Sequence, residues 1–488
     1  MKKEKILSLL PLLVLLVLSS FLFLNNLGNT PLKSWDEAWY AEISRNIIKS
    51  NNWFLLQWNG LPYFDHPPLG FWAVALSFKI FGVSEFSTRL PSAISGIFSL
   101  ILIYLIGKEL FNKTVGLGAS LILLSTPWFW LRSREGDLDI ILVLFVLLSI
   151  YLTLKAKSNL KILPFLALSI AFMLLTKTMI GLGIFPLIAY LYYKPQKFNF
   201  KFIFISLIIL ILTVGSWYFI NFIHYGLPFI DRNIFITGMK MASYKAIGKS
   251  VGKFMLFPKP NLYNLHMGIL LWYKPFIVSL FGSLLFLKSK SFRAILLWNI
   301  TYLLLFFTSD KTQLWHFIII YPAIALLVSA FVFNLSKIVL NILKIQIGKL
   351  YRFQIKSGMT VVLASVITIV FISWTGNRIV KGLYKDIVKN QPINDEIILS
   401  KAAKENEGTI YIDDDYWMTA VFYSERIVYS IPLSSETPLK NIPMVFENSS
   451  KPFLILTKKW ILDRDKINPQ NYEILKQVGD RVLIKSKI

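Results

Sequence analysis

Long apolar stretches separated by short polar segments recur from the N-terminus to about residue 374 of the 488-residue chain. An α-helix needs about 20 predominantly apolar residues to cross the hydrocarbon core of a bilayer. The pattern therefore predicts a multi-pass α-helical membrane protein with about 11–13 transmembrane helices. We expect eleven spans near residues 6–24, 89–107, 115–131, 140–154, 162–175, 178–193, 202–220, 267–287, 294–308, 317–333 and 357–374.

The basic residues between the apolar stretches predict the orientation of the chain. Cytoplasmic loops carry an excess of Lys and Arg, and segments 155–161 and 288–293 are both rich in them. All of the basic loops fall on the cytoplasmic side when the N-terminus also lies in the cytoplasm. We expect the first apolar stretch to be retained as an anchor, because no small-residue cleavage site follows it. Counting residues 67–82 as a span would invert every later loop, so we interpret them as a juxtamembrane or re-entrant element.

The composition changes near residue 375, where short strand-like runs separated by polar turns replace the long apolar stretches. We expect a transmembrane domain at 1–374 with a first extracytoplasmic loop at 25–88. Residues 375–488 are predicted to form a soluble, extracytoplasmic α/β domain. The cell membrane is the expected location.

Overall composition narrows the chemistry that is available. Mean hydropathy is +0.57, and the net charge of +25 lies in short inter-span segments, which argues against a nucleic-acid partner. The chain has no cysteine, which excludes disulfides, thiolate metal sites and a cysteine nucleophile. Catalysis must therefore use carboxylates, His, Lys, Arg, Ser or Tyr.

Two carboxylate clusters lie on the predicted outer face. Asp36 and Glu37 open a helical pattern flanked by aromatic residues, and residues 134–139, ending in Asp139, precede the span at 140–154. Carboxylates also favour the first turn of a helix for structural reasons, so either cluster alone has a structural explanation. Two clusters at one membrane boundary favour a functional site, because such residues tend to line cavities.

A third candidate element contains Tyr63, Asp65 and His66 before a double proline that fixes the backbone. His66 could be a base, a phosphate ligand or a metal ligand, and a lone histidine is more often structural. Asp65 and His66 with another outer histidine, such as His316, could hold a divalent cation, although no spacing is diagnostic. A metal cofactor is therefore not required by the sequence.

Outer cations complete the predicted site. Lys177, Lys240 and Lys311 lie between apolar stretches, and His316 follows the last of them. Snorkelling of long side chains to the interface would explain each lysine separately. Together with the carboxylates, these cations would suit a phosphate-bearing lipid substrate near the interface.

Three segments resemble a known superfamily. Residues 35–42 (WDEAWYAE), 59–69 (NGLPYFDHPPL) and 81–92 (FGVSEFSTRLPS) are similar to the beginning of protein O-mannosyltransferases and aminoarabinose (lipid A) transferases. The likeness extends over roughly residues 1–330. The resemblance implies a GT-C fold and a glycosyltransferase that uses a polyprenyl-phosphate sugar as donor.

The resemblance also implies roles for particular residues. Asp36 matches the aspartate assigned as catalytic base, Glu37 is its acidic neighbour, and Asp139 matches the second family aspartate. Asp65 and His66 stand where aminoarabinose transferases have Glu-Lys, whose lysine is implicated in binding donor phosphate. The histidine here argues against an aminoarabinose transferase and leaves the donor sugar open.

The expected reaction is sugar transfer from polyprenyl phosphate to a hydroxyl or phosphate acceptor on a protein, glycolipid or polysaccharide, with inversion at the anomeric carbon. Asp36 would take the proton from the acceptor, and Asp139 would orient the base or the acceptor. His66, Lys177, Lys240 and Lys311 would neutralise the donor phosphate, with Tyr63, Asp65 and His316 nearby. The alternative is a lipid-linked-sugar transporter or flippase, although such proteins place their charges near the midplane and often show repeats.

Overall fold

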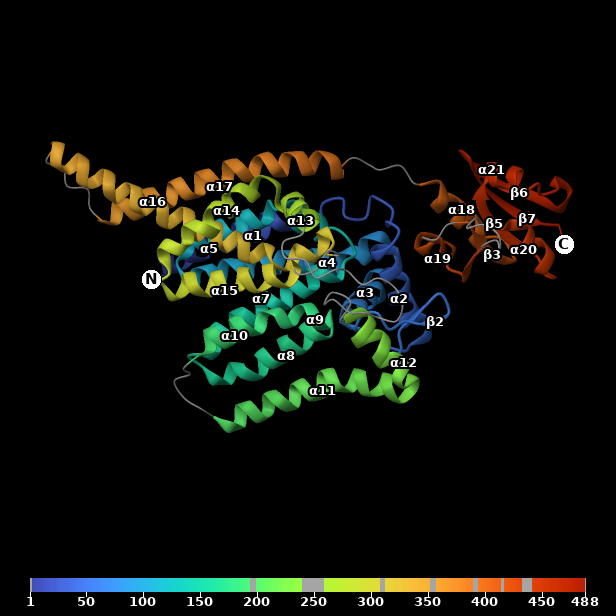
Figure 1. Ribbon diagram of the computed structural model, residues 1–488, viewed down its shortest axis with the longest axis horizontal. Coiled ribbons are helices and arrows are strands. Elements are labelled where there is room, and N and C mark those ends of the chain that lie inside the picture. The colour runs from blue at the N-terminus through green and yellow to red at the C-terminus, as the bar shows by residue number, and fades with distance from the viewer. Residues whose placement is uncertain are drawn as a thin grey trace. The chain divides into compact units, whose positions relative to one another are not determined.

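The protein is mostly α-helical in a computed structural model (Figure 1), which describes residues 2–193, 199–238, 259–307, 312–351, 357–388, 394–413, 417–431 and 441–487. The chain divides into two compact units. The helical unit comprises Met1–Asn26, Phe64–Gly70 and Leu90–Lys389, and the mixed unit comprises Leu27–Tyr63, Phe71–Arg89 and Asn390–Ile488. Each unit is described separately below.

Consecutive helices dominate the helical unit. Their bounds are α1 (Lys2–Leu24), α4 (Glu85–Leu110), α5 (Lys113–Leu124), α6 (Pro127–Arg132), α7 (Leu138–Ala156), η1 (Leu160–Ile162), α8 (Leu163–Leu174), α9 (Thr178–Gly181), η2 (Leu182–Ile184), α10 (Phe185–Tyr192), α11 (Phe200–Tyr225), α12 (Leu227–Ile230), the π-helix η3 (Asp231–Gly238), α13 (Lys259–Ile269), η4 (Leu270–Trp272), α14 (Tyr273–Gly282), η5 (Ser283–Phe286), α15 (Lys290–Phe306), η6 (Leu314–Ile319), α16 (Tyr321–Tyr351) and α17 (Ser357–Val388).

All eleven predicted apolar stretches fall on helical segments, so the predicted helical class is confirmed. In the part of the chain that the structure describes, six helices are long and apolar enough to cross a membrane. These are Glu85–Leu110, Leu138–Ala156, Phe200–Tyr225, Lys259–Phe286, Tyr321–Lys344 and Gly358–Gly382. Shorter apolar helices account for the other stretches, and the total number of spans stays a prediction.

Small residues allow α4 and α5 to pack closely. A Cβ atom added at Gly116 on α5 would lie 2.3 Å from the backbone oxygen of Tyr104 on α4. One added at Gly118 would lie 2.4 Å from Ser329 Oγ on α16. Close backbone approach through small residues is typical of helix packing in membranes, where van der Waals contact replaces the hydrophobic driving force. Helix α5 is therefore clamped between two neighbours.

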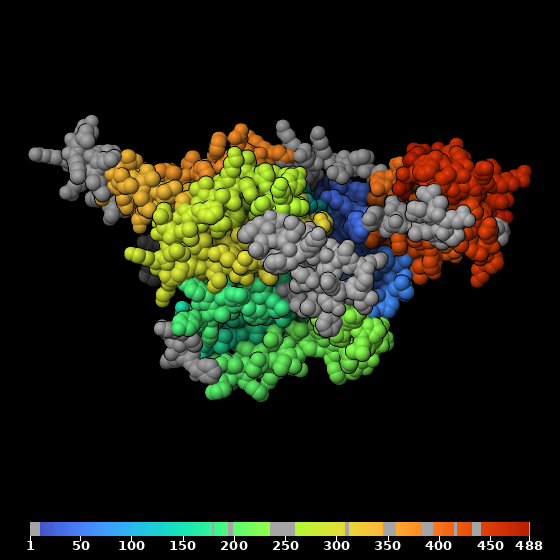
Figure 2. Space-filling view, in the orientation of Figure 1, coloured from blue at the N-terminus to red at the C-terminus, as the bar shows by residue number. Residues whose placement is uncertain are grey.

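Helix α11, drawn in green, packs against α8 and leaves most of its apolar side chains exposed (Figures 1 and 2). Phe204, Ile211 and Phe219 are each more than 60% exposed. A helix that is apolar all round is suited to lipid rather than to water. This surface agrees with the expectation of a membrane-embedded chain.

The mixed unit contains a five-stranded sheet of order β4-β3-β5-β7-β6, in which β3 is parallel to β4 and β5, while β7 is antiparallel to β5 and β6. The α/β fold expected for the C-terminal part is thus present as a sheet with helices, and its extracytoplasmic location stays a prediction. The elements of this unit are α2 (Asp36–Ser50), β1 (Gln57–Trp58), β2 (Leu61–Pro62), α3 (Leu69–Phe81), α18 (Asp395–Lys404), β3 (Thr409–Ile412), α19 (Met418–Ser424), β4 (Val428–Ser430), α20 (Ile442–Asn448), β5 (Phe453–Lys458), α21 (Lys459–Arg464), η7 (Pro469–Asn471), β6 (Tyr472–Val478) and β7 (Arg481–Ser486).

Helix α3 covers most of the ambiguous segment 67–82. Its 13 residues correspond to about 20 Å, less than the roughly 30 Å of a bilayer core. The compact mixed unit joins the first loop to the C-terminal residues, and α17 continues past residue 374 to Val388. The division at 374/375, which was drawn from the expected membrane topology, stays a prediction.

The close contact at Gly116 predicts a stability effect. Gly116→Ala should lower the thermal midpoint, with a cost of about 1–3 kcal/mol, because the new methyl group meets backbone that cannot move aside. Gly358→Ala on α17 is the matched control, since a Cβ there meets nothing within 4 Å. Thermal unfolding of the purified proteins in one detergent measures both variants. Equal midpoints for the two would contradict this packing.

Candidate active site

The candidate residues are divided between the two units. Asp36, Glu37 and Tyr63 belong to the mixed unit. The helical unit holds Asp65, His66, Asp139, Lys177 and His316. Lys240 and Lys311 lie outside the described residues, so their predicted role is not tested here. The two groups are described in turn.

Lys177 and Asp139 form a buried ion pair in the helical unit. Lys177 follows the end of α8, Asp139 lies in the first turn of α7, and Lys177 Nζ is 2.6 Å from Asp139 Oδ1. Asp139 is only 2% exposed, and among the described residues its Oδ2 atom has no hydrogen-bond partner. A buried carboxylate oxygen of this kind is costly unless something else binds to it. The pair therefore presents a half-satisfied carboxylate beside a cation.

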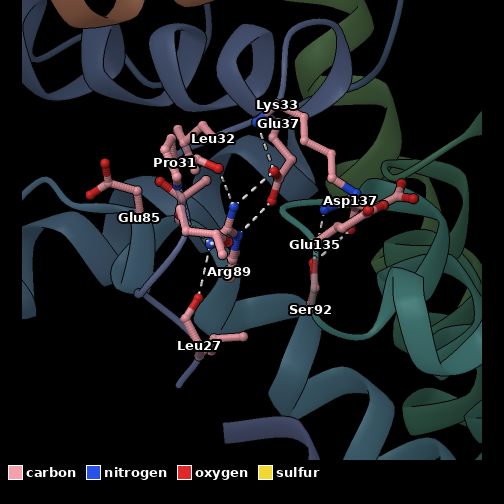
Figure 3. A network of polar contacts seen from close by, with 12 residues as sticks. Leu27, Pro31, Leu32, Lys33, Glu37, Glu85, Arg89, Ser92, Glu135 and Asp137 are labelled. Carbon is pink, nitrogen blue, oxygen red and sulfur yellow. Dashed lines mark hydrogen bonds and ion pairs between the residues drawn. The ribbon is translucent and has the colours of Figure 1, made fainter. Parts of the chain in front are cut away.

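Asp137, two residues earlier, has a structural role. Its side chain accepts a hydrogen bond from the backbone N–H of Asp139 and so caps α7. Its backbone carbonyl also accepts from the Ser92 hydroxyl (Figure 3), and its carboxylate lies 3.0 Å from Arg132 Nε. The preference for Asp139 over Asp137 as the functional aspartate is consistent with this capping.

Arg132 is a cation that the candidate set lacked. It lies near Asp139 and His316, whose ionisation its charge influences, and its guanidinium stacks on Trp128 and Trp315 at 5.4 and 5.6 Å. Arginine suits such a place because it stacks on aromatic rings while keeping its charge. The signal in the sequence is an arginine two residues after Trp130, at the end of an apolar stretch.

His66 and His316 are both neutral at physiological pH. Burial first, and then the Lys177 ammonium, lower the pKa of His66 well below its ordinary value. Burial and the same ammonium lower the pKa of His316 to about 4. His316 Nδ1 accepts a hydrogen bond from the backbone N–H of Gln313 at 3.1 Å, which leaves its proton on Nε2. The two imidazoles can therefore donate hydrogen bonds but carry no charge.

Asp65 pairs with Arg232 through two contacts, at 2.5 Å from Nε and 3.2 Å from Nη2. The next residue, Asn233, donates to the backbone carbonyl of Phe64 at 2.7 Å and is 3% exposed. These contacts tie the loop that carries His66 to η3. Among the residues that the structure describes, no group of three or more acidic or histidine side chains could hold a metal ion. The metal site suggested for Asp65 and His66 gains no support.

Asp36 is the first residue of α2, and Glu37 beside it is buried in an ion pair with Arg89 (Figure 3). Arg89 Nε and Nη2 lie 2.7 and 3.0 Å from the two Glu37 oxygens. The remaining donors of Arg89 bind the backbone carbonyls of Leu27, Thr30 and Pro31. One buried guanidinium thus fixes both the loop before α2 and the start of the helix.

Trp35, directly before Asp36, has an unusual backbone conformation. Its φ of 74° and ψ of −130° fall in a region that residues with a side chain rarely adopt. Such strain persists only where surrounding contacts determine the backbone. Here the Lys33 N–H donates to Glu37 Oε2 at 2.9 Å, and the Ala38 N–H donates to the Lys33 carbonyl at 3.2 Å.

Tyr63 packs among aromatic rings of the mixed unit. Its ring lies edge-on to Trp39 and Phe71, at 5.4 and 5.5 Å between centroids. It is 5% exposed. Its predicted place in a substrate site stays a prediction.

The lowered pKa values of His66 and His316 predict a dependence of stability on pH. Between pH 6.5 and about 4 the unfolded chain binds more protons than the folded one. Stability from these groups is therefore complete above pH 6.5 and declines as the pH falls through that range. Thermal midpoints between pH 7.5 and 4.5 should fall less in His66→Asn than in the unaltered protein. His224→Asn, at an exposed position, is the control and should reproduce the unaltered slope.

The chain is similar in sequence to known proteins. Residues 65–219 match the family model described as dolichyl-phosphate-mannose-protein mannosyltransferase. The undecaprenyl phosphate-alpha-4-amino-4-deoxy-L-arabinose arabinosyl transferase 2 of Proteus mirabilis is 35% identical over 165 residues, which are 33% of this chain and 30% of that protein. An uncharacterized protein of Aquifex aeolicus is 27% identical over 239 residues, which cover 47% of this chain and 46% of that one. The chain thus matches half or less of the length of these two relatives.

Solved structures share the fold over almost the whole chain. ArnT from Cupriavidus metallidurans bound to undecaprenyl phosphate has a TM-score of 0.72 at 14% identity, with 97% of both chains covered. The Archaeoglobus fulgidus oligosaccharyltransferase in the apo form has a TM-score of 0.60 at 14% identity, covering 92% of this chain and 69% of that one. The predicted GT-C fold is confirmed. In sequence the chain is similar to protein mannosyltransferases and aminoarabinose transferases, and in fold to these solved structures.

Proposed function

We propose that the protein transfers a sugar from a polyprenyl-phosphate donor to an acceptor on the extracytoplasmic face of the cell membrane. The family match over residues 65–219 supports a glycosyltransferase, and the likeness to a structure bound to undecaprenyl phosphate supports a lipid-linked donor. The observation that carries the proposal is the ion pair between Lys177 and Asp139. Lys177 contacts Asp139 Oδ1, and Asp139 Oδ2 has no hydrogen-bond partner among the described residues.

The donor phosphate would be bound by cations of the helical unit. Lys177 is buried beside Asp139, so its ammonium acts through a medium of low dielectric constant, where it stabilises a developing negative charge strongly. His66 and His316 are neutral and would contribute N–H donors rather than charge. We assign Lys240 to the same phosphate from its predicted place among the outer cations, and Lys311 from the resemblance as well.

The reaction needs a base more than an acid. Polyprenyl phosphate departs as a stabilised anion when its bond to the anomeric carbon breaks, so its departure needs no strong acid. The acceptor hydroxyl is a weak nucleophile, and Asp36 would take its proton as the new bond to the anomeric carbon forms. The Asp139 oxygen without a partner would orient the acceptor or the base. Direct displacement inverts the anomeric configuration.

Glu37 has a different role in this proposal. Its carboxylate is 2% exposed and both of its oxygens face Arg89, so it is committed to the ion pair. It would act as a positioning residue that fixes the start of α2. Asp36 is only partly buried, which leaves it accessible to a substrate.

Paired isosteric substitutions separate these two roles. Asp36→Asn should abolish transfer while the protein still folds, since it removes the base at a partly exposed position. Glu37→Gln should lower stability by about 3–5 kcal/mol, because it leaves the Arg89 charge buried without a counterion. Transfer is followed with radiolabelled undecaprenyl-phosphate sugars and total membrane lipid and protein as acceptors. Full transfer by folded Asp36→Asn would refute the assignment of the base.

A further inference from the structure

The first loop and the C-terminal residues share one hydrophobic core in the mixed unit. Ala38 and Ala41 of α2 are buried in a cluster with Phe422 and Tyr423 of α19. The sequence separation between these helices exceeds 370 residues. The helix that begins with Asp36 is therefore supported by the C-terminal part of the chain.

Arg45 adds a polar connection between α2 and α19. It is 4% exposed and donates to the backbone carbonyls of Phe422 and Val421, at 2.8 and 3.4 Å, in the last turn of α19. A cation at this end of a helix binds the unpaired carbonyls and complements the helix dipole. Its guanidinium also lies 4.7 Å from the centre of the Phe422 ring and pairs with Glu42.

Tyr423 connects α19 to the loop that precedes Asp36. Its hydroxyl accepts a hydrogen bond from the backbone N–H of Leu32 at 2.8 Å and donates to Glu85 Oε1 at 2.9 Å. Burial and the neighbouring Glu85 carboxylate raise the pKa of Tyr423 above its ordinary value, so the hydroxyl keeps the proton that it donates. Leu32 is 1% exposed, so without Tyr423 its N–H would lose this buried partner.

Three consecutive residues before α2 are thus held in place. Arg89 binds the Pro31 carbonyl, Tyr423 binds the Leu32 N–H, and Glu37 binds the Lys33 N–H. Two of these contacts come from the first hundred residues, and the third comes from the C-terminal part. The strained backbone at Trp35 follows directly, and such strain is released when the contacts that impose it are lost.

We propose that Tyr423 is a positioning residue for Asp36, through which the C-terminal part of the chain holds the loop before α2 in its active geometry. The expected effect on rate rests on the proposed function. The positioning of the loop by Tyr423 does not depend on it. In this account the C-terminal residues complete the catalytic loop rather than only selecting an acceptor.

Tyr423→Phe in the full chain removes the hydroxyl and keeps the ring in the core. Hydrogen–deuterium exchange of peptides covering residues 30–37 should accelerate by about tenfold or more, since the Leu32 N–H loses its acceptor. Peptides from α7 should exchange as before. With undecaprenyl-phosphate mannose or undecaprenyl-phosphate aminoarabinose as donor, kcat should fall by about tenfold. The Kd for undecaprenyl phosphate should not change, because the proposed phosphate ligands belong to the other unit.

The control is Tyr429→Phe on β4, which removes the hydroxyl of a half-exposed tyrosine in the same unit and should change none of these quantities. Should Tyr423→Phe fail to fold, Glu85→Gln weakens the same hydroxyl contact and should accelerate exchange in residues 30–37 by about threefold. Unchanged exchange in residues 30–37 would overturn the inference, as would accelerated exchange with an unchanged kcat. An active Asp36→Asn variant, measured in parallel, would refute the proposed base independently of Tyr423.

Discussion

The ion pair between Arg89 and Glu37 is the constraint on which the proposed catalytic loop depends. Two charges removed from water are stable only when their hydrogen-bonding groups are satisfied. The donors of Arg89 reach Glu37 and the carbonyls of Leu27, Thr30 and Pro31, so satisfying one guanidinium determines the path of the loop. Asp36 adjoins this network as the first residue of α2 and is partly exposed.

In the helical unit, the two carboxylates of the second cluster differ in the contacts that they make. Asp137 caps α7 and forms an ion pair with Arg132. Asp139, two residues later in the first turn of α7, pairs with Lys177 through Oδ1, and its Oδ2 has no hydrogen-bond partner among the described residues. Within each cluster we assign a structural role to one carboxylate, Glu37 or Asp137, and a chemical role to its neighbour, Asp36 or Asp139. Burial and charge, rather than residue type, make that distinction.

The helices and most of the candidate residues could be predicted from the sequence. The contacts between these residues could not, for physical reasons. Hydrophobic runs predicted the helices because a membrane span must be apolar along its whole length. The candidates Asp139 and Lys177 were both identified, but their pairing is a tertiary contact across 38 residues. The partner of Glu37 lies 52 residues away, and Tyr423 lies 391 residues from Leu32. Contacts at such separations leave no periodic signal, so the joining of the first loop to the C-terminal sheet was not foreseen. The charge state of His66 likewise depends on burial, which the motif does not encode.

The function we propose is transfer of a lipid-linked sugar, in which cations would stabilise the departing phosphate and a carboxylate would accept a proton. The central claim is that the bond between sugar and phosphate breaks. The most direct measurement places the purified protein in liposomes with undecaprenyl-phosphate sugar labelled in both the sugar and the lipid. The account predicts that free undecaprenyl phosphate accumulates in step with sugar on an added acceptor, with inverted anomeric configuration. Intact donor that crosses the bilayer without cleavage would contradict it and would identify a flippase.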